Sequence, residues 1–458
     1  MSLKHLTPRL THGLPPSPRH PAIVQTIGGR RFPYSYLEHC QACCGDTFTL
    51  YPLDRAPMVF LANPNDIRAV LTGDPDELHP GEGGHTIAPL IGNRSFMLQE
   101  GEDHRSGRKT ITPAFHRHIV AEQTQMLADV VDQAVESWPT ARCVPIYPQI
   151  RALTLTIILR VIFTQESPQE LTTLHLQLTR TLAISDSLLL QGPRLRKLPG
   201  WRAIWQRFLH ERAELDRLLY EIIDHRGLAK DQPVEHRDLL DTLLADDEQM
   251  GRVEIRDNLQ SMILAGHETT TGQLAWALLL LAHHPDIQQR LYEELHAGNE
   301  TYLHATIEET MRRRPVFVFT IPRVVHAPVQ IGDWTYRPPV HLAPCTYLMH
   351  HDPGLYENPR RFEPDRFLGG RPAPRIWQPW GGGRKHCLGR HFAMLEVEAV
   401  LRRVITTRRV VAQASSLERP RWRSAILVPS SGARVKLINR ASAGRSSTSG
   451  YVHNVSIY

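Results

Sequence analysis

Residues 378–394 read QPWGGGRKHCLGRHFAM, and this stretch carries more chemical information than any other part of the 458-residue chain. Its centre is Cys387, which three consecutive glycines precede and Gly389 follows. Glycine allows a backbone to come close to a flat or bulky group. The basic residues at 384–386 and the start of a helix expected near Arg390 would both lower the pKa of the thiol. Cys387 is therefore a candidate nucleophile or metal ligand, against the alternative of an inert buried cysteine.

The composition, 41% hydrophobic and 22% charged, is typical of a globular protein. The length alone suggests three domains at roughly 150 residues each, but we find no repeat and no linker between two cores. Six cysteines are too few for a disulfide scaffold, and the Cys40-x-x-Cys43-Cys44 cluster lacks a second ligand pair. No apolar run reaches the ~20 residues of a membrane span, and no secretory signal is visible. We expect a cytoplasmic protein without a membrane anchor.

The net charge of +6 is compatible with an acidic protein partner, an anionic membrane surface or nucleic acid, of which nucleic acid is the weakest because aromatics make up only 7% and no basic block is present. Helical periodicity dominates from about residue 100 to 314. Strands are expected at Phe317–Ile321, at Val329–Ile331 and around Ile426 and Val435. These patterns predict a mainly α protein with small β-sheets, in which residues 1–35 form a Pro-rich, extended arm and residues 440–458 a disordered tail.

A long helix is expected from Val253 to His284, and its middle reads AGHETTTG at residues 265–272. Glycine costs about 1 kcal/mol there relative to alanine, and threonine is also a poor helix former. A Thr hydroxyl can bond to the carbonyl four residues earlier and bend the helix. The segment is either a helix-packing notch or a functional site.

The loop around Cys387 resembles the haem-binding loop of cytochrome P-450 monooxygenases. Trp380, Gly381, Gly383, Lys385 and Gly389 fall on the family's cofactor-binding positions, and the resemblance makes Cys387 the thiolate ligand of the haem iron. Trp380 stands where the family usually has Phe, and Lys385 where Arg usually pairs with a haem propionate. The resemblance runs from His104 to Gly389 and therefore covers most of the chain. It implies one domain over residues 1–439 that encloses haem b.

The other motifs take their roles from the same resemblance. Ala265, Glu268 and Thr269 are similar to the oxygen-activation motif, in which Thr269 and Glu268 handle protons. The remaining assignments are these: haem-propionate partners His104, Arg108 and Arg323; a structural ion-pair triad of Glu309, Arg312 and Arg366; and a substrate pocket that includes Ile263, Phe317, Val318, Phe319 and Ala425.

The implied reaction inserts one oxygen atom of O2 into a lipophilic small molecule, such as a terpenoid, fatty acid or polyketide. Electrons would come from a separate ferredoxin or flavodoxin with its reductase, docking on Arg384, Lys385, Arg390, Arg402 and Arg403. Two alternatives remain: a haem-thiolate enzyme that works as a peroxygenase or rearrangement catalyst without external electrons, and a non-catalytic haem sensor.

Overall fold

The computed structural model of the chain describes residues 9–11, 13–53, 55–188, 199–228, 238–245 and 250–440. The predicted tail lies outside these residues, apart from Arg440. The described helices are α1 Ala22–Arg31, α2 Pro33–Cys44, α3 Pro64–Thr72, α4 Pro80–Gly83, α5 Ala88–Ile91, α6 Gly101–Ile111, α7 Arg117–Glu122, α8 Thr124–Ser137, α9 Tyr147–Ile162, α10 Pro168–Leu188, α11 Pro199–Leu228, α12 Leu239–Leu244, α13 Arg252–His283, α14 Pro285–His296, α15 Thr301–Arg313, α16 Thr346–His350 and α17 Arg390–Thr407.

The strands are short and form five small sheets among the described residues. The largest has the order β3-β4-β10-β7-β5, and the others are β11-β14-β6, β1-β2, β8-β9 and β12-β13. Their bounds are β1 Arg9–Thr11, β2 Leu14–Ser17, β3 Thr47–Leu50, β4 Met58–Leu61, β5 Leu78–His79, β6 Cys143–Pro145, β7 Arg323–Val325, β8 Val329–Ile331, β9 Trp334–Tyr336, β10 His341–Pro344, β11 Arg408–Ala412, β12 Pro420–Arg423, β13 Ile426–Pro429 and β14 Arg434–Asn439. The prediction of a mainly helical protein with small sheets is confirmed.

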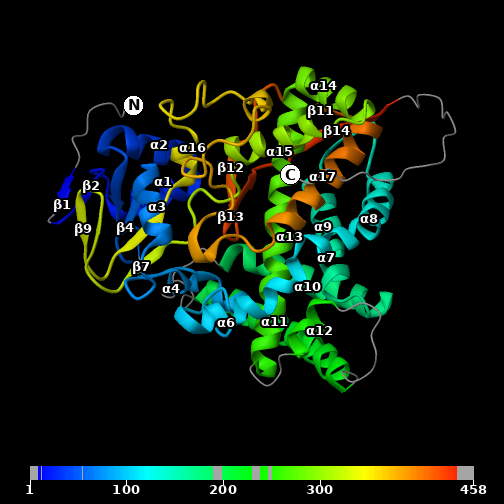
Figure 1. Ribbon diagram of the computed structural model, residues 1–458, viewed down its shortest axis with the longest axis horizontal. Coiled ribbons are helices and arrows are strands. Elements are labelled where there is room, and N and C mark those ends of the chain that lie inside the picture. The colour runs from blue at the N-terminus through cyan, green and yellow to red at the C-terminus, as the bar shows by residue number, and fades with distance from the viewer. Residues whose placement is uncertain are drawn as a thin grey trace.

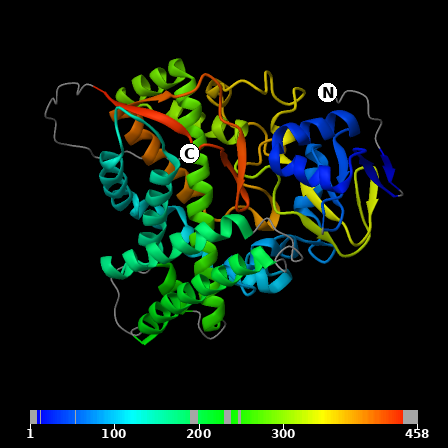
Figure 2. The same ribbon diagram turned by 180° about the vertical axis from the view of Figure 1, so that it is seen from behind.

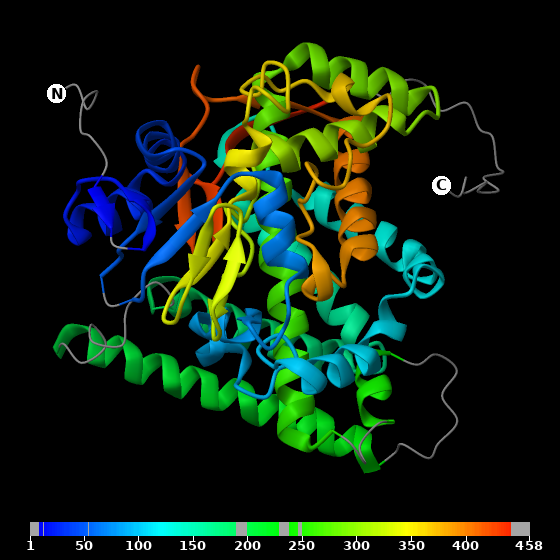
Figure 3. The same cartoon turned by 60° about the vertical axis from the view of Figure 1, so that its left-hand side comes forward.

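Helix α13 runs through the middle of the molecule, between the β-rich side and the larger helical side (Figures 1 and 2). It contacts α9, α15, α17, β11 and β13. From Leu274 to Leu281 every residue is buried, as expected for a helix that is apolar on all sides. Figure 3 shows α17 beside α13, with the long helix α11 along one edge of the molecule.

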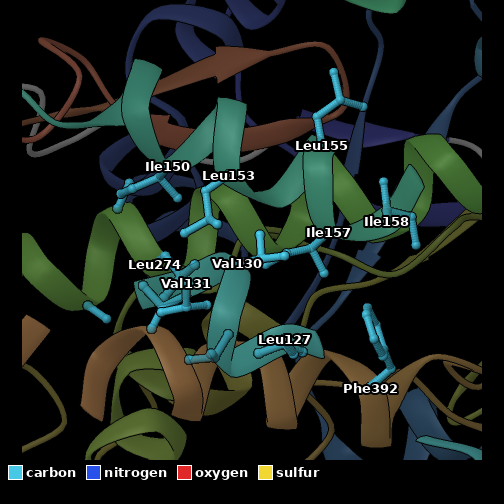
Figure 4. Close-up of a cluster of buried hydrophobic side chains, with 14 of the residues drawn as sticks. Leu127, Val130, Val131, Ile150, Leu153, Leu155, Ile157, Ile158, Leu274 and Phe392 are labelled. Carbon is cyan, nitrogen blue, oxygen red and sulfur yellow. The ribbon is translucent and has the colours of Figure 1, made fainter. Parts of the chain in front are cut away.

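The main hydrophobic core lies where α8, α9, α13 and α17 meet (Figure 4). Leu127 of α8, Ile150 and Leu153 of α9, Leu274 of α13 and Phe392 of α17 all have exposed fractions below 5%. Because α17 begins directly after the Cys387 loop, this core fixes the position of that loop relative to α13.

Most expectations about local structure are confirmed, among them the strands at Val329–Ile331 and around Ile426 and Val435, and two are wrong. The long central helix, the helix that begins at Arg390 and the turn after Ile331 are present as predicted. Residues 317–321 form no strand: the Thr320 N–H donates to the Pro344 carbonyl and the Val318 carbonyl accepts from the Tyr347 N–H, but these two bonds do not continue as a ladder. Residues 22–31 form helix α1 rather than an extended arm.

Candidate active site

The Cys387 loop folds tightly against the end of helix α3. The Cys387 N–H donates to the Trp380 carbonyl over 2.9 Å, which closes the loop. Gly383 has a φ of +65°, and a Cβ at this position would lie 1.8 Å from the Leu71 carbonyl oxygen. Only glycine fits there. A Cβ on Gly389 would meet nothing within 4 Å, so space remains beyond the half-buried thiol.

Burial raises the pKa of the Cys387 thiol in the chain without a bound metal. The Gly389 N–H and the charges of Arg108 and Arg390 act in the opposite direction but do not outweigh burial. The predicted lowering of this pKa by residues 384–386 is therefore wrong, because other cations face the sulfur and because desolvation dominates. Coordination to a metal would deprotonate such a thiol outright.

Four nitrogen-bearing side chains from distant parts of the sequence gather near this loop. His104 is 5% exposed, its Nε2 has no hydrogen-bond partner, and burial together with Lys385 lowers its pKa to about 3. Arg323 is 4% exposed, and burial lowers its pKa to about 10. Lys385 has its pKa lowered to about 8, again mainly by burial, and Arg108 lies beside both Lys385 and the thiol.

This cluster has an excess of buried positive charge. Within the described ranges, no carboxylate forms an ion pair with Arg108, Arg323 or Lys385, although Glu100 lies close enough to oppose the burial effect on Arg323 and Lys385. Buried cations need compensating anions. The orphaned nitrogen of His104 and these cations therefore fit the anionic edge of a haem whose iron is held by Cys387.

Lys385 also has a structural role that its sequence position did not reveal. Its Nζ donates to the carbonyls of Met97 and Gln99, at 3.0 and 2.7 Å, and lies 3.4 Å from that of Phe96. The side chain thus ties the Cys387 loop to residues 96–99.

Helix α13 has one accessible stripe in an otherwise buried stretch. Between Ile255 and Ala282, the partly exposed residues are Leu264, Ala265, Gly266 and Thr269. Ala265 and Thr269 are four apart and share a helix face. The Thr269 hydroxyl donates to the Ala265 carbonyl over 2.5 Å. These are residues of the predicted oxygen-activation motif.

Glu268 points away from this stripe and binds Arg151 of α9. Arg151 donates through Nη2 and Nε to Glu268 Oε1, at 2.8 and 3.1 Å. Burial alone would raise the pKa of Glu268, but the neighbouring His267, Arg151 and Arg423 together reverse this and lower it. Burial lowers the pKa of His267 to about 3, and this neutral ring bonds to the Thr154 hydroxyl at 2.8 Å.

The predicted triad forms one buried network. Arg312 donates to both oxygens of Glu309, at 2.7 and 2.9 Å, and Arg366 Nε lies 3.2 Å from Glu309 Oε2 without hydrogen-bond geometry. Arg312 also donates to the His350 carbonyl over 2.7 Å. The network joins α15 to the coil that leads to the Cys387 loop.

The predicted pocket residues lie in different environments. Ile263 and Val318 are each 1% exposed and pack within hydrophobic clusters, so neither reaches accessible space. Phe317 is 40% exposed, and Ala425 is half-buried. Phe319 is also half-buried and makes an edge-to-face contact with Phe60.

An apolar group that we call the upper cluster lies near the accessible stripe. It joins the segment from residue 87 to 98 with α10, α11 and α13. Its buried members are Leu90, Ile91, Leu98, Leu182 and Phe208, and partly buried Ile87, Ala88, Met97, Ile184, Ile204, Trp205 and Leu264 pack against them.

Two functional candidates were not anticipated from the sequence. Arg151 could have been noticed as a charge on an apolar helix. Glu396 of α17 is 1% exposed, and burial raises its pKa well above the ordinary value despite a hydrogen bond to Thr270.

No helix within the described ranges combines the length and apolar character that crossing a membrane requires.

The chain resembles known proteins over nearly its whole length. A family model described as cytochrome P-450 matches residues 14–437. Cytochrome P-450 135B1 of Mycobacterium tuberculosis is 34% identical over 450 residues, which cover 95% of this chain and 93% of the relative. Cytochrome P-450 137 of the same organism is 33% identical, over 91% of this chain and 87% of the relative.

Two solved structures share the fold. A cyanobacterial CYP120A1 with bound retinoic acid superimposes with a TM-score of 0.81 at 24% identity, covering 93% of this chain and 99% of the other. CYP175A1 from Thermus thermophilus gives a TM-score of 0.73 at 22% identity, covering 91% and 96%. The chain therefore belongs to the cytochrome P-450 family of haem-thiolate monooxygenases.

Proposed function

We propose that the chain oxidises a lipophilic small molecule in the cytoplasm, with electrons delivered by a separate ferredoxin or flavodoxin and its reductase. The observation that carries this proposal is the upper cluster beside the accessible stripe of α13. Apolar side chains from four segments converge there, and burial of apolar ligand surface against them would supply the binding free energy.

Each site residue has a role in this proposal. Cys387 would hold the haem iron, and His104, Arg108, Arg323 and Lys385 would pair with its propionates. Gly381, Gly383 and Gly389 leave room for the group beside the loop, and Trp380 and Ala265 would contact it. Bound haem supplies the oxygen chemistry.

Two side chains of α13 would manage protons. The Thr269 hydroxyl, at the accessible stripe, is placed to donate a hydrogen bond to a ligand in the pocket once it leaves the Ala265 carbonyl. Glu268 stays ionised beside Arg151 and can take up and release a proton only when this pair opens. Phe317, Phe319 and Ala425 would contact substrate.

The ferrous carbon-monoxide spectrum of the wild type and of Cys387→Ser tests the ligand assignment. We expect the red-shifted band of thiolate ligation in the wild type and its loss in the variant. A wild type without that band would overturn the assignment of Cys387.

A spin-state screen then tests the substrate class, with terpenoids, fatty acids and polyketides against polar compounds of equal size. Retinoic acid belongs in the screen because the cyanobacterial CYP120A1 structure contains it. Turnover that requires a surrogate ferredoxin and reductase supports the monooxygenase. Equal turnover with peroxide alone favours the peroxygenase, and no turnover with any spin-shifting ligand favours the sensor.

A further inference from the structure

Three potential metal ligands meet on the β-rich side of the molecule, separate from the residues assigned to haem. They are His79 at the end of β5, Glu82 in α4 and His326 directly after β7. Their ligand atoms all lie within 4.8 Å of one another. Glu82 Oε2 lies 2.5 Å from His326 Nε2 and 4.0 Å from His79 Nδ1, so both rings face the same carboxylate oxygen.

The backbone beneath these side chains is held firmly. Strand β5 pairs with β7 so that His79 lies opposite Val324, and the His326 N–H donates to the Glu77 carbonyl over 2.8 Å. Helix α4 packs directly on the residue before Arg323, because a Cβ on Gly83 would lie 1.8 Å from the Pro322 carbonyl oxygen. The donors therefore need only side-chain adjustment to surround an ion.

The two imidazole rings are stacked in a way that suits neutral ligands. Their centroids are 3.7 Å apart with an interplanar angle of 15°. Two imidazolium rings at this distance would repel each other. Two neutral imidazoles and one carboxylate form a donor set that suits Zn2+ and neighbouring transition metals, whereas Mg2+ prefers oxygen ligands alone.

We propose that His79, Glu82 and His326 form a binding site for a divalent transition-metal cation such as Zn2+. The side chains are 23%, 45% and 43% exposed, so water can complete the coordination shell. Because His326 lies 244 residues from Glu82 in the sequence, the ion fastens two distant segments together. One is the start of the loop that enters the upper cluster, and the other is the strand that carries Arg323.

Zn2+ binding to the haem-loaded, tag-free chain tests this proposal by isothermal titration and by metal analysis after dialysis. Cys43 and Cys44 offer competing donors, since their sulfurs are 3.3 Å apart. The experiment therefore uses a Cys43→Ser/Cys44→Ser background. We expect one Zn2+ per chain, no competition from excess Mg2+, and an affinity that falls about tenfold or more in His326→Ala and in Glu82→Gln.

The matched control is His116→Ala/His118→Ala. It removes two exposed histidines that lie outside the site and whose ring centroids are 5.8 Å apart. This control should bind Zn2+ as tightly as the background protein. Unchanged binding in His326→Ala, or an equal loss in the control, would overturn the proposal, as would the absence of stoichiometric binding in the background protein. Haem content and circular dichroism show that each variant is folded.

Discussion

The carboxyl group of Glu396 is buried in the core without a full set of hydrogen-bond partners. Its Oε1 has no hydrogen-bond partner, and burial raises its pKa well above that of an exposed glutamate. The folded protein therefore keeps this proton at a pH at which the unfolded chain loses it. As a result, the group lowers the unfolding free energy progressively as the pH rises above about 4.5, by about 1.4 kcal/mol per pH unit, until the folded-state pKa is reached.

Replacement of Glu396 by Gln should remove this pH dependence. We expect the variant to gain stability relative to the wild type as the pH rises from 5 toward 8, with the smallest gain at pH 5. Urea unfolding of the haem-loaded protein at several pH values measures the difference. The control is Glu122→Gln, on the exposed side of α7. Its unfolding free energy should depend on pH in the same way as that of the wild type. Parallel curves for Glu396→Gln as well would show that the folded protein ionises this group.

Cys387 could be found from the sequence because its signal is local: glycines, cations and a helix start lie within a few residues. Arg151 shows in the sequence only as a charge on an apolar helix, and Glu396 has no local signal. Their importance comes from burial and from partners on other helices, Glu268 for Arg151 and Thr270 for Glu396. His267 shows the same limit: its Nδ1 bonds to the Thr154 hydroxyl, a partner that no local sequence pattern indicates, while its buried Nε2 has no hydrogen-bond partner.

Gly266 shows that the irregular part of α13 also serves helix packing. A Cβ here would lie 2.7 Å from Cδ1 of Ile158 in α9, the residue labelled in Figure 4. Gly266→Ala should therefore overpack this contact, at about 1–3 kcal/mol, offset by about 1 kcal/mol of helix propensity. Ile158→Val removes the colliding methyl group. The double variant should therefore lose less unfolding free energy than the sum of the losses in Gly266→Ala and Ile158→Val.

A double-mutant cycle by urea unfolding measures this coupling, and additive effects would contradict the packing explanation. Gly227→Ala is the control. At that position in α11 the added Cβ would meet a single neighbour, Leu244 Cδ2, at 3.9 Å. It should stabilise the protein by up to about 1 kcal/mol.

The network between α15 and the following coil should be sensitive to loss of one partner. Arg366→Met leaves Glu309, which is fully buried, with Arg312 as its remaining ion-pair partner. We expect a loss of about 3–5 kcal/mol in unfolding free energy, because a buried charge is then undercompensated. Arg361→Met is the control, since its side chain is 74% exposed and pairs with Glu363 at 3.7 Å. Equal stability of the two variants would show that the network contributes little.

The sequence predicted helices and strands correctly where an apolar pattern extends over many residues. It failed where the segment is short. The apolar character of α13 extends over several turns and defines its length. By contrast, residues 317–321 look like a strand because Phe, Val and Ile favour strands, but their backbone makes only isolated hydrogen bonds to the backbone of residues 344–347 and no regular ladder. Helix α1 follows Pro21 and has no apolar face that a sequence pattern could reveal.

At the scale of the whole molecule, the cationic cluster is made by the fold rather than by any one motif. It combines α6, β7 and the Cys387 loop, which bring His104, Arg323 and Lys385 together across 281 residues of sequence. Three of the cations that were expected to receive an electron donor have partners within the protein. Lys385 bonds to backbone carbonyls, Arg402 pairs with Glu300 at 2.7 Å, and Arg403 pairs with Asp132 at 3.1 Å.

Of the five cations expected to receive the donor, Arg384 is exposed and pairs with no acid in the described ranges, whereas Arg390 is half-buried. If an acidic ferredoxin or flavodoxin docks here, Arg384→Glu should lower the second-order rate of haem reduction by about tenfold at low salt. The salt dependence of that rate should also weaken, because one screened attraction has been removed.

Stopped-flow reduction with a surrogate ferredoxin measures both effects on the docking rate. Arg337→Glu provides the control, since Arg337 is exposed just after β9, on the β-rich side of the molecule (Figure 1). It makes the same change in net charge at a distant position and should alter the rate only slightly. Equal rate losses in the two variants would mean that net charge, rather than the face around Cys387, attracts the donor.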